Sequence, residues 1–280
     1  MPQIINTNIA SLNAQRNTAT SQSSLQTSMQ RLSSGLRVNS AKDDAAGLAI
    51  AERMNTQVRG MNVAVRNAND GISLAQTAEG AMSKVGDSLQ RMRELAVQAR
   101  NATNTTTDLD SIGKEYAQLS EEIGRVLGGT TFNGKAILAG DAGALTFQVG
   151  ANTTTNDEVV LTTTDMAGNA DITTVTGATI DNTSDATSLK TIIDNIDTAI
   201  TTVSGERATL GAAQNRFEAV IGNLQISVEN QSAARSRIMD ADFAAETANL
   251  SRAQILQQAG NTMVAQANQL PQQVLALLRN

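Results

Sequence analysis

Large apolar side chains recur every seven residues between residues 189 and 224, and this spacing limits the folds open to the chain. An α-helix brings every seventh residue back to nearly the same face, whereas neighbouring residues of a strand point to opposite faces. The stripe consists of Leu189, Ile196, Val203, Leu210, Phe217 and Leu224. Burial of each such side chain contributes about 1.5–3 kcal/mol, so the spacing predicts a long coiled-coil helix packed against a second helix.

A second stripe with the same spacing comes earlier in the chain and offers that partner. It consists of Met54, Met61, Ala68, Ala75, Met82, Leu89 and Ala96. Ser40 followed by Asp43 fits a capping box, so a helix is expected to begin there and to run to about residue 100. We expect the two stripes to pair antiparallel within the chain, which places Met54 and Met61 in the same intrachain seam.

The middle of the chain carries the signals of a shorter helix and of a β-hairpin. Thr107 and Asp110 match a second capping pair, which predicts a helix over residues 108–127. Asn133-Gly134 is a typical two-residue hairpin turn. Apolar and polar residues then alternate over residues 145–149, as expected of a half-buried strand.

The same turn lies in a segment that resembles a phosphate-binding loop. Residues 129–136 read GTTFNGKA, which fits GxxxxGK, but Ala136 stands where a serine or threonine must hold magnesium. A helical segment precedes the loop and a strand-like segment follows it, which is the reverse of the order that such a loop needs. A glycine-rich hairpin is therefore favoured over an enzyme that uses this loop.

Residues 151–187 differ in composition from the rest of the chain. They are rich in threonine, asparagine, aspartate and glycine and contain only small apolar clusters. We interpret this segment as a short surface insert of strands or loops.

Both ends of the chain carry further apolar stripes at helical spacing. They comprise Ile5, Ile9, Leu12, Leu25, Met29, Leu32 and Leu36 at the N-terminus, and Leu256, Met263, Leu270 and Leu277 near the C-terminus. Such stripes need a surface that covers them. The two ends could pack only against each other, or they could pack between subunits. Small residues such as Gly260 and Ala267 permit close helix approach in both cases, so periodicity leaves both interpretations open.

The composition argues against several classes of function. The chain has no cysteine, which excludes disulfides and thiolate chemistry, and no histidine, the commonest general base and metal ligand. A net charge of −6 disfavours general nucleic-acid binding. Carboxylate pairs such as Asp43/Asp44 fall at expected helix starts, where capping explains them. We expect no catalysis, no cofactor and no metal site.

The sequence shows no signal for membrane insertion or for secretion. No segment is long and apolar enough to span a bilayer, and the polar faces of the terminal helices lack the lysines of a membrane-surface helix. Residues 1–10 have neither the basic start nor the apolar run of a secretory signal. Taken alone, these features predict a cytoplasmic protein without membrane contact.

Five sequence blocks nevertheless resemble the bacterial flagellin family. They are residues 33–50 (SSGLRVNSAKDDAAGLAI), 90–98 (QRMRELAVQ), 131–134 (TFNG), 237–243 (RIMDADF) and 274–279 (VLALLR). The blocks lie at both ends of the chain, at the separations typical of the family. The resemblance covers about the first 150 and the last 95 residues.

The resemblance implies a mainly α fold: an elongated antiparallel helical bundle or coiled coil with a small β-hairpin region and a short variable insert. Residues 1–40 and 236–280 would form the terminal helical domain of the inner tube. Residues 41–150 and 188–235 would form the helical core domain, with the β-hairpin near 130–150. Residues 151–187 would be the short variable surface insert.

The resemblance also implies a role in assembly. The chain would polymerise with itself into the flagellar filament for swimming motility, and the terminal stripes named above would drive that assembly. Export would proceed unfolded through the flagellar type III apparatus, which needs no cleaved signal and replaces the cytoplasmic expectation with an extracellular filament. An export chaperone and the filament cap and junction proteins are the implied bacterial partners. A hook–filament junction protein of the same export family is the alternative.

Flagellins are also ligands of host innate immune receptors. Arg91, Leu95 and Glu115 match the pattern of the family's Toll-like receptor contact. Leu277, Leu278 and Arg279 match the C-terminal motif that cytosolic inflammasome receptors bind. The resemblance therefore implies that these six residues contact host receptors.

Overall fold

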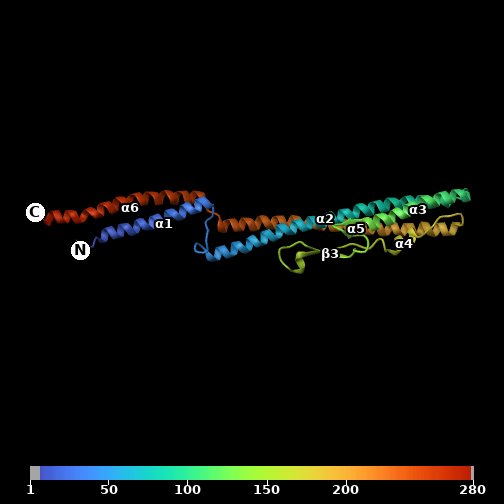
Figure 1. Cartoon of the computed structure of the whole chain (residues 1–280), viewed down its shortest axis with the longest axis horizontal. Coiled ribbons are helices and arrows are strands. Elements are labelled where there is room, and N and C mark those ends of the chain that lie inside the picture. The colour runs from blue at the N-terminus through green and yellow to red at the C-terminus, as the bar shows by residue number, and fades with distance from the viewer. Residues whose placement is uncertain (1–6, 279–280) are drawn as a thin grey trace. The chain divides into compact units, whose positions relative to one another are not determined.

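A computed structural model describes the backbone of residues 7–278 and the side chains of residues 7–269. In this part of the chain, six α-helices and two small antiparallel sheets are present (Figure 1). The helices are α1 (Ile9–Ser34), α2 (Ala45–Ala99), α3 (Thr106–Gly129), α4 (Ala170–Thr176), α5 (Ala186–Met239) and α6 (Phe243–Leu278). The strands are β1 (Thr131–Phe132), β2 (Lys135–Ala136), β3 (Ala144–Gln148) and β4 (Glu158–Thr162). These elements confirm the predicted mainly α class with a small β region.

The chain folds into two compact units. Residues 1–56 and 230–280 form one of them, here called the terminal unit, and residues 57–229 form the other, the central unit. The division falls inside α2 and α5 rather than at the expected boundaries, and it does not separate residues 151–187 from the central unit.

Helix α2 begins four residues later than the sequence predicts. The Asp44 carboxylate accepts a hydrogen bond from the Gly47 amide at 2.8 Å, and Asp44 therefore caps the helix. The Ser40 hydroxyl donates to Asp43 at 3.1 Å, so the predicted capping pair forms a separate turn ahead of the helix. Hydrogen bonds from the backbone amides of Ser40 and Asn39 hold the pKa of Asp43 below its usual value.

Helix α3 begins two residues earlier than predicted. Its capping box is Thr105 with Asp108, whose side chains and backbone amides bond reciprocally. The Thr105 hydroxyl donates to the Asp108 carboxylate at 2.7 Å and lowers the pKa of that carboxyl. Thr107 with Asp110 has the same spacing, so the local sequence offers two equivalent starts and the predicted one is wrong.

The hairpin predicted at Asn133-Gly134 is confirmed. Strands β1 and β2 pair antiparallel on either side of this turn. Asn133 has a φ of 49° and Gly134 a φ of 80°, the left-handed pair that a two-residue hairpin of this kind requires. The segment that resembled a phosphate-binding loop is thus the turn of a hairpin.

Residues 151–187 contribute to the core and are not confined to the surface. Strand β4 pairs antiparallel with β3, and α4 packs against α3. Six side chains of the segment are buried in the central core: Val159, Leu161, Met166, Ile172, Val175 and Ile180. The expectation of a surface insert is corrected, because the apolar residues of this segment are buried although they are too sparse to show a period in the sequence.

The core of the central unit contains residues of α2, α3, α4, α5 and β4. Helices α2 and α5 run antiparallel in it. A Cβ added at Gly71 would lie 2.7 Å from the Phe217 ring, and one added at Gly86 would lie 3.9 Å from Val203. Arg93 of α2 forms an ion pair with Asp197 of α5. As the residue number on α2 rises, that of its neighbour on α5 therefore falls.

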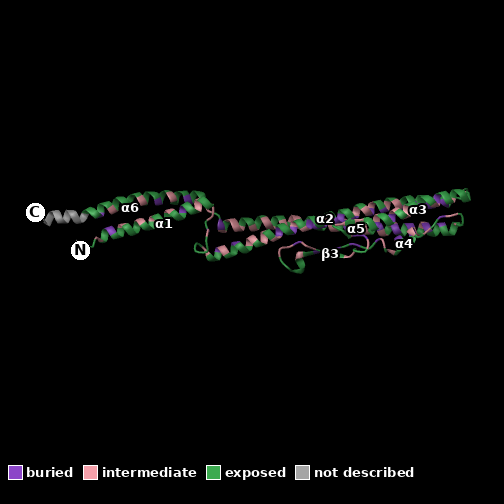
Figure 2. Cartoon of the chain, viewed as in Figure 1, coloured by how far each residue is buried: buried purple, intermediate pink, exposed green. Residues whose placement is uncertain are grey.

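The residues of the intrachain seam differ in burial along its length (Figure 2). Met61, Leu189, Ile196, Val203, Leu210 and Phe217 are buried. Met54 and Leu224 are half-buried. The Phe217 ring also contacts Phe147 of β3 edge-on, with ring centroids 5.4 Å apart, which joins the sheet to α5.

Candidate assembly surface on the terminal helices

Helices α1 and α6 form an antiparallel pair in the terminal unit (Figure 1). At one end of the pair, the Asn8 side chain donates to the Ala267 carbonyl at 2.7 Å and the Ser11 hydroxyl donates to Asn268 at 2.7 Å. Towards the other end, Arg31 lies 3.9 Å from Glu246. The two stretches at the ends of the sequence are thus one structural element.

Small and polar residues form the contact between the two helices, here called the terminal seam. Ser11 and Ser28 of α1 are each only 5% exposed. On α6 the seam consists of Glu246, Ala253, Gly260 and Ala267, which fall seven residues apart. A Cβ at Gly260 would meet the Thr18 hydroxyl at 2.5 Å, so the absence of a side chain there lets the helices approach closely.

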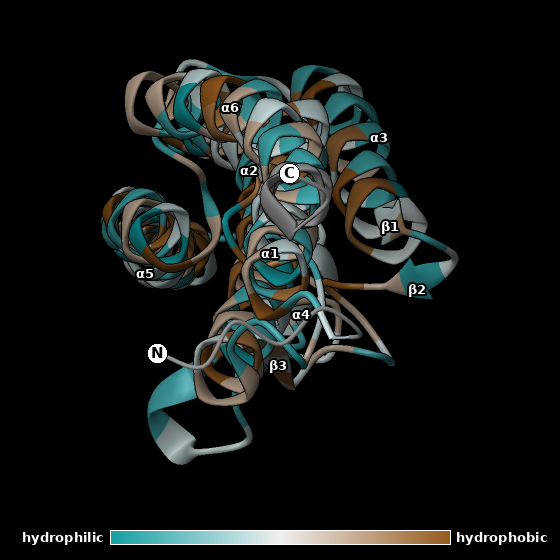
Figure 3. Cartoon of the chain, turned by 90° about the vertical axis from the view of Figure 1, so that its left-hand side faces the viewer, coloured by the Kyte–Doolittle hydropathy of each residue, from teal (hydrophilic) through white to brown (hydrophobic). Residues whose placement is uncertain are grey.

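The large apolar residues of both helices are exposed instead. Ile9 is 65% exposed, Leu12 55%, Met29 56%, Leu256 51% and Met263 62%. Figure 3 shows hydrophobic and hydrophilic segments interspersed on the ribbons of the helices. Packing of the two ends against each other therefore leaves five of the eight stripe residues with described side chains exposed. The concentration of large exposed apolar side chains on α1 and α6 makes this pair the candidate interaction surface.

The remaining residues of the terminal stripes have other positions. Leu25 and Leu32 are half-buried on α1. Leu36 packs against a small cluster of Val38, Ala51 and Met239 within the terminal unit. Ile5 lies outside the described residues, and the side chains of Leu270 and Leu277 lie outside the described side chains.

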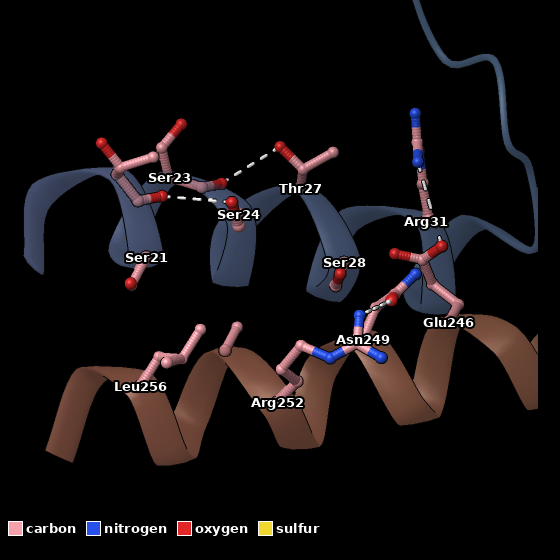
Figure 4. A pocket seen from close by; sticks show the side chains of 12 residues that line it. Ser21, Ser23, Ser24, Thr27, Ser28, Arg31, Glu246, Asn249, Arg252 and Leu256 are labelled. Atoms are coloured by element: carbon pink, nitrogen blue, oxygen red, sulfur yellow. Dashed lines mark hydrogen bonds and ion pairs between the residues drawn. The ribbon is translucent and has the colours of Figure 1, made fainter. Parts of the chain in front are cut away.

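A polar groove of about 460 Å³ lies between α1 and α6 (Figure 4). Serine and threonine side chains of α1 line one wall, and Glu246, Asn249 and Arg252 of α6 line the other. The Arg252 guanidinium donates to the Asn249 side chain at 3.2 Å. Within the described residues no three His, Cys, Asp or Glu side chains lie close enough to hold a metal ion. The groove offers hydrogen bonds and charge rather than a set of reacting groups.

A short corner in the terminal unit joins the end of α1 to the end of α5, and sequence reasoning missed it. The Arg37 guanidinium donates twice to the Ile238 carbonyl, at 3.2 and 2.7 Å, and Leu36 forms a β-bridge with Asp240. Gly35 ends α1 with a φ of 70°, which is the one local signal for the corner. The contacts join residues 201 positions apart, which no periodicity reports.

The three residues of the expected Toll-like receptor contact lie on neighbouring helices. The Arg91 guanidinium of α2 donates twice to the Glu115 carboxylate of α3, at 2.9 and 2.7 Å, and both side chains are exposed. These hydrogen bonds raise the pKa of Arg91. Leu95 is only 1% exposed and belongs to the core. The side chains of Leu277 and Leu278, and all of Arg279, lie outside the described part.

No helix within residues 7–278 is long and apolar enough to cross a lipid bilayer.

Comparison with known proteins identifies relatives along nearly the whole chain. Residues 5–142 match the family described as "Bacterial flagellin N-terminal helical region", and residues 193–278 match "Bacterial flagellin C-terminal helical region". Flagellin of Halalkalibacterium halodurans is 48% identical over 276 residues, covering 99% of this chain and 100% of that protein. Flagellin of Bacillus subtilis is 43% identical over 308 residues, covering 98% of this chain and 99% of that protein.

A solved structure shares the fold at a greater distance. It is that of a flagellar hook-associated protein from Vibrio parahaemolyticus, with a TM-score of 0.61 and 13% identity. The match covers 71% of this chain and 100% of that one. At this identity the likeness shows a common fold alone.

Proposed function

Because this chain belongs to the bacterial flagellin family, we propose that it is a structural subunit that polymerises into the extracellular flagellar filament. The observation that carries the proposal is the outward position of the large apolar residues on α1 and α6. Copies that meet through two different surfaces assemble head to tail, and the product is an open helix when the rotation does not close. The role is assembly for motility and involves no catalysis.

The energetics of the terminal helices favour assembly over isolation. Burial of each large aliphatic side chain contributes about 1.5–3 kcal/mol, and the outward residues include Ile9, Leu12 and Leu256. The terminal seam itself contains mostly serine, alanine and glycine, which bury little apolar area on pairing. Contacts with other copies would therefore supply much of the stabilisation of these helices.

The double substitution Leu12→Ser/Leu256→Ser tests the proposal. Both side chains are more than half exposed, so the subunit should fold as before. Polymerisation should fail, because the critical concentration rises by about a hundredfold or more when two such side chains lose their burial. Seeded polymerisation, followed by light scattering and electron microscopy, measures the effect.

Ile226→Ser is the matched control, since Ile226 is 60% exposed but lies on α5 in the central unit. This variant should polymerise with close to the unaltered critical concentration. Normal filaments from Leu12→Ser/Leu256→Ser would rule out the terminal helices as the main assembly surface.

We further propose that the subunit is exported unfolded through the flagellar type III apparatus. Helices that lack a partner surface are marginal in water, and the thin terminal seam is easily opened before assembly. An export chaperone would cover the C-terminal helix during this stage, and folding would finish at the filament tip beneath the cap protein. Junction proteins would connect the finished filament to the hook.

A hook–filament junction protein remains the alternative, and the fold shared with the hook-associated protein supports it at the level of architecture. The full-length flagellin relatives at 48% and 43% identity favour the filament subunit. Immunogold labelling separates the two: a filament subunit is labelled along the whole filament, a junction protein only at its base.

We also propose that host innate immune receptors bind the chain, with Arg91 and Glu115 as the surface contact for a Toll-like receptor. Both side chains are exposed and hold each other in place. Leu95 would contribute through packing and not through direct contact with the receptor, since its side chain is buried. Leu277, Leu278 and Arg279 would bind inflammasome receptors after delivery of the protein to the cytosol.

Arg91→Ala tests the Toll-like receptor contact. Loss of a charged contact should raise the concentration for half-maximal activation in a reporter assay by about tenfold. Arg93→Ala is the control, because Arg93 is also exposed but pairs with Asp197 on α5. Equal activation by the unaltered protein and by Arg91→Ala would exclude Arg91 from the contact.

A further inference from the structure

We propose that Met29 and Met263 are oxidation sites through which peroxide blocks assembly of the free subunit. The inference rests on the proposed function, because it requires the outward faces of α1 and α6 to be covered in the filament.

The exposure of the methionines separates these two from the others. Met29 is 56% exposed and Met263 is 62% exposed. Of the eight methionines whose side chains the structure describes, these are the only two that are exposed. The buried ones are Met61, Met82, Met92, Met166 and Met239, and Met54 is half-buried. Oxidation of methionine follows access to the sulfur, so the folded subunit should react first at Met29 and Met263.

The chemistry is a two-electron oxygen transfer. The Met thioether sulfur attacks one oxygen of hydrogen peroxide, the O–O bond breaks, and the sulfur–oxygen bond of the sulfoxide forms. The sulfur loses two electrons, and the second peroxide oxygen leaves as water after a proton shift. No metal, cofactor or neighbouring base of the protein takes part.

Oxidation places a polar sulfoxide where the filament contact would bury an apolar side chain. Seam residues such as Ser28 face α6, whereas Met29 next to it faces outward. Oxidation therefore leaves the terminal seam intact and changes only the surface that other copies cover. A sulfoxide oxygen that loses water without gaining a hydrogen bond opposes that contact.

Limited treatment of the monomer with hydrogen peroxide tests the proposal. Peptide mass spectrometry should find the added oxygen first at Met29 and Met263, while the five buried methionines stay unmodified. Seeded polymerisation should slow by about tenfold or more, with unchanged helical content. Methionine sulfoxide reductases acting on both epimers should restore the rate.

The variant Met29→Leu/Met263→Leu keeps the apolar surface and removes both sulfurs. It should polymerise before treatment and remain competent after it. Met54→Leu is the matched control and should stay as sensitive as the unaltered protein. Loss of polymerisation by treated Met29→Leu/Met263→Leu would overturn the proposal, and so would normal polymerisation of unaltered protein carrying both sulfoxides.

A competition within one sample makes the test independent of any variant. When half-oxidised monomer is seeded, the filaments should be depleted in sulfoxide at positions 29 and 263 relative to the supernatant. Equal sulfoxide content in both fractions would overturn the oxidation proposal while leaving assembly standing. Failure of the untreated, unaltered protein to polymerise would instead contradict the proposed function itself.

Discussion

Replacement of Phe217 by alanine is expected to lower the free energy of unfolding of the central unit by about 3–5 kcal/mol. The side chain is fully buried between α2 and α5, and its ring contacts Phe147 edge-on at 5.4 Å. The smaller residue would leave a cavity opposite Gly71, which has no side chain to fill it. The loss should therefore affect both the helix pair and the sheet.

The chain contains its own probe for this measurement. Tyr116 is the only tyrosine, there is no tryptophan, and the Tyr116 side chain is buried in the core of the central unit. Urea unfolding followed by Tyr116 fluorescence should show a lower midpoint with little change in slope. Phe243→Ala is the control, since Phe243 is 56% exposed. This variant should change the free energy of unfolding by less than about 0.5 kcal/mol and should therefore leave the midpoint almost unchanged. Similar midpoints for both variants would contradict the central position assigned to Phe217.

Replacement of Gly260 by leucine is expected to separate α1 from α6 and to prevent assembly. A Cβ at this position would lie 2.5 Å from the Thr18 hydroxyl, and the rest of a leucine side chain has no space in the terminal seam. Overpacking of this kind costs about 1–3 kcal/mol. Hydrogen exchange of the α1 amides should accelerate, and seeded polymerisation should fail.

Alanine variants at positions 18 and 260 separate the effect of the steric contact from that of helix propensity. Gly260→Ala gains about 0.5–1 kcal/mol from the reduced freedom of the unfolded chain, which partly offsets the clash. Removal of the hydroxyl in Thr18→Ala/Gly260→Ala leaves the Thr18 β-carbon position 3.5 Å away, an ordinary contact. The double variant should therefore show slower exchange than either single variant. Equal exchange in Gly260→Leu and the unaltered protein would show that the helices do not meet at this residue.

The central helices could be predicted because their seam contains large residues at a regular spacing. Leu189, Ile196 and Val203 have no comparable alternative face, so periodicity alone places them inwards. The hairpin at Asn133-Gly134 was equally predictable, because only a few residue types adopt its left-handed turn. The cap of α3 was not, since two Thr-Asp pairs with the same spacing compete within three residues.

The candidate site was predictable in its residues but not in its geometry. The spacing of Leu256 and Met263 identifies an apolar stripe. The residues that face α1 are Gly260 and Ala267, each four positions after one of these two. The spacing of apolar residues shows which side chains are favoured in a buried position. It does not show which neighbouring surface buries them. Close approach of two helices selects small residues. Ala253, Gly260 and Ala267 recur every seven residues, but such small side chains add little to a hydrophobic stripe.

The amino-acid sequence by itself determined the helical class, the antiparallel central helices, the hairpin turn and the family. Each of these depends on local conformational preference or on large side chains that recur at one period. Only the tertiary structure decided that residues 151–187 complete the core, that Leu95 is buried, and that five large residues of the terminal stripes are exposed. These features depend on which surfaces meet across long separations in the chain, and small or isolated residues specify such contacts only when the whole fold is present.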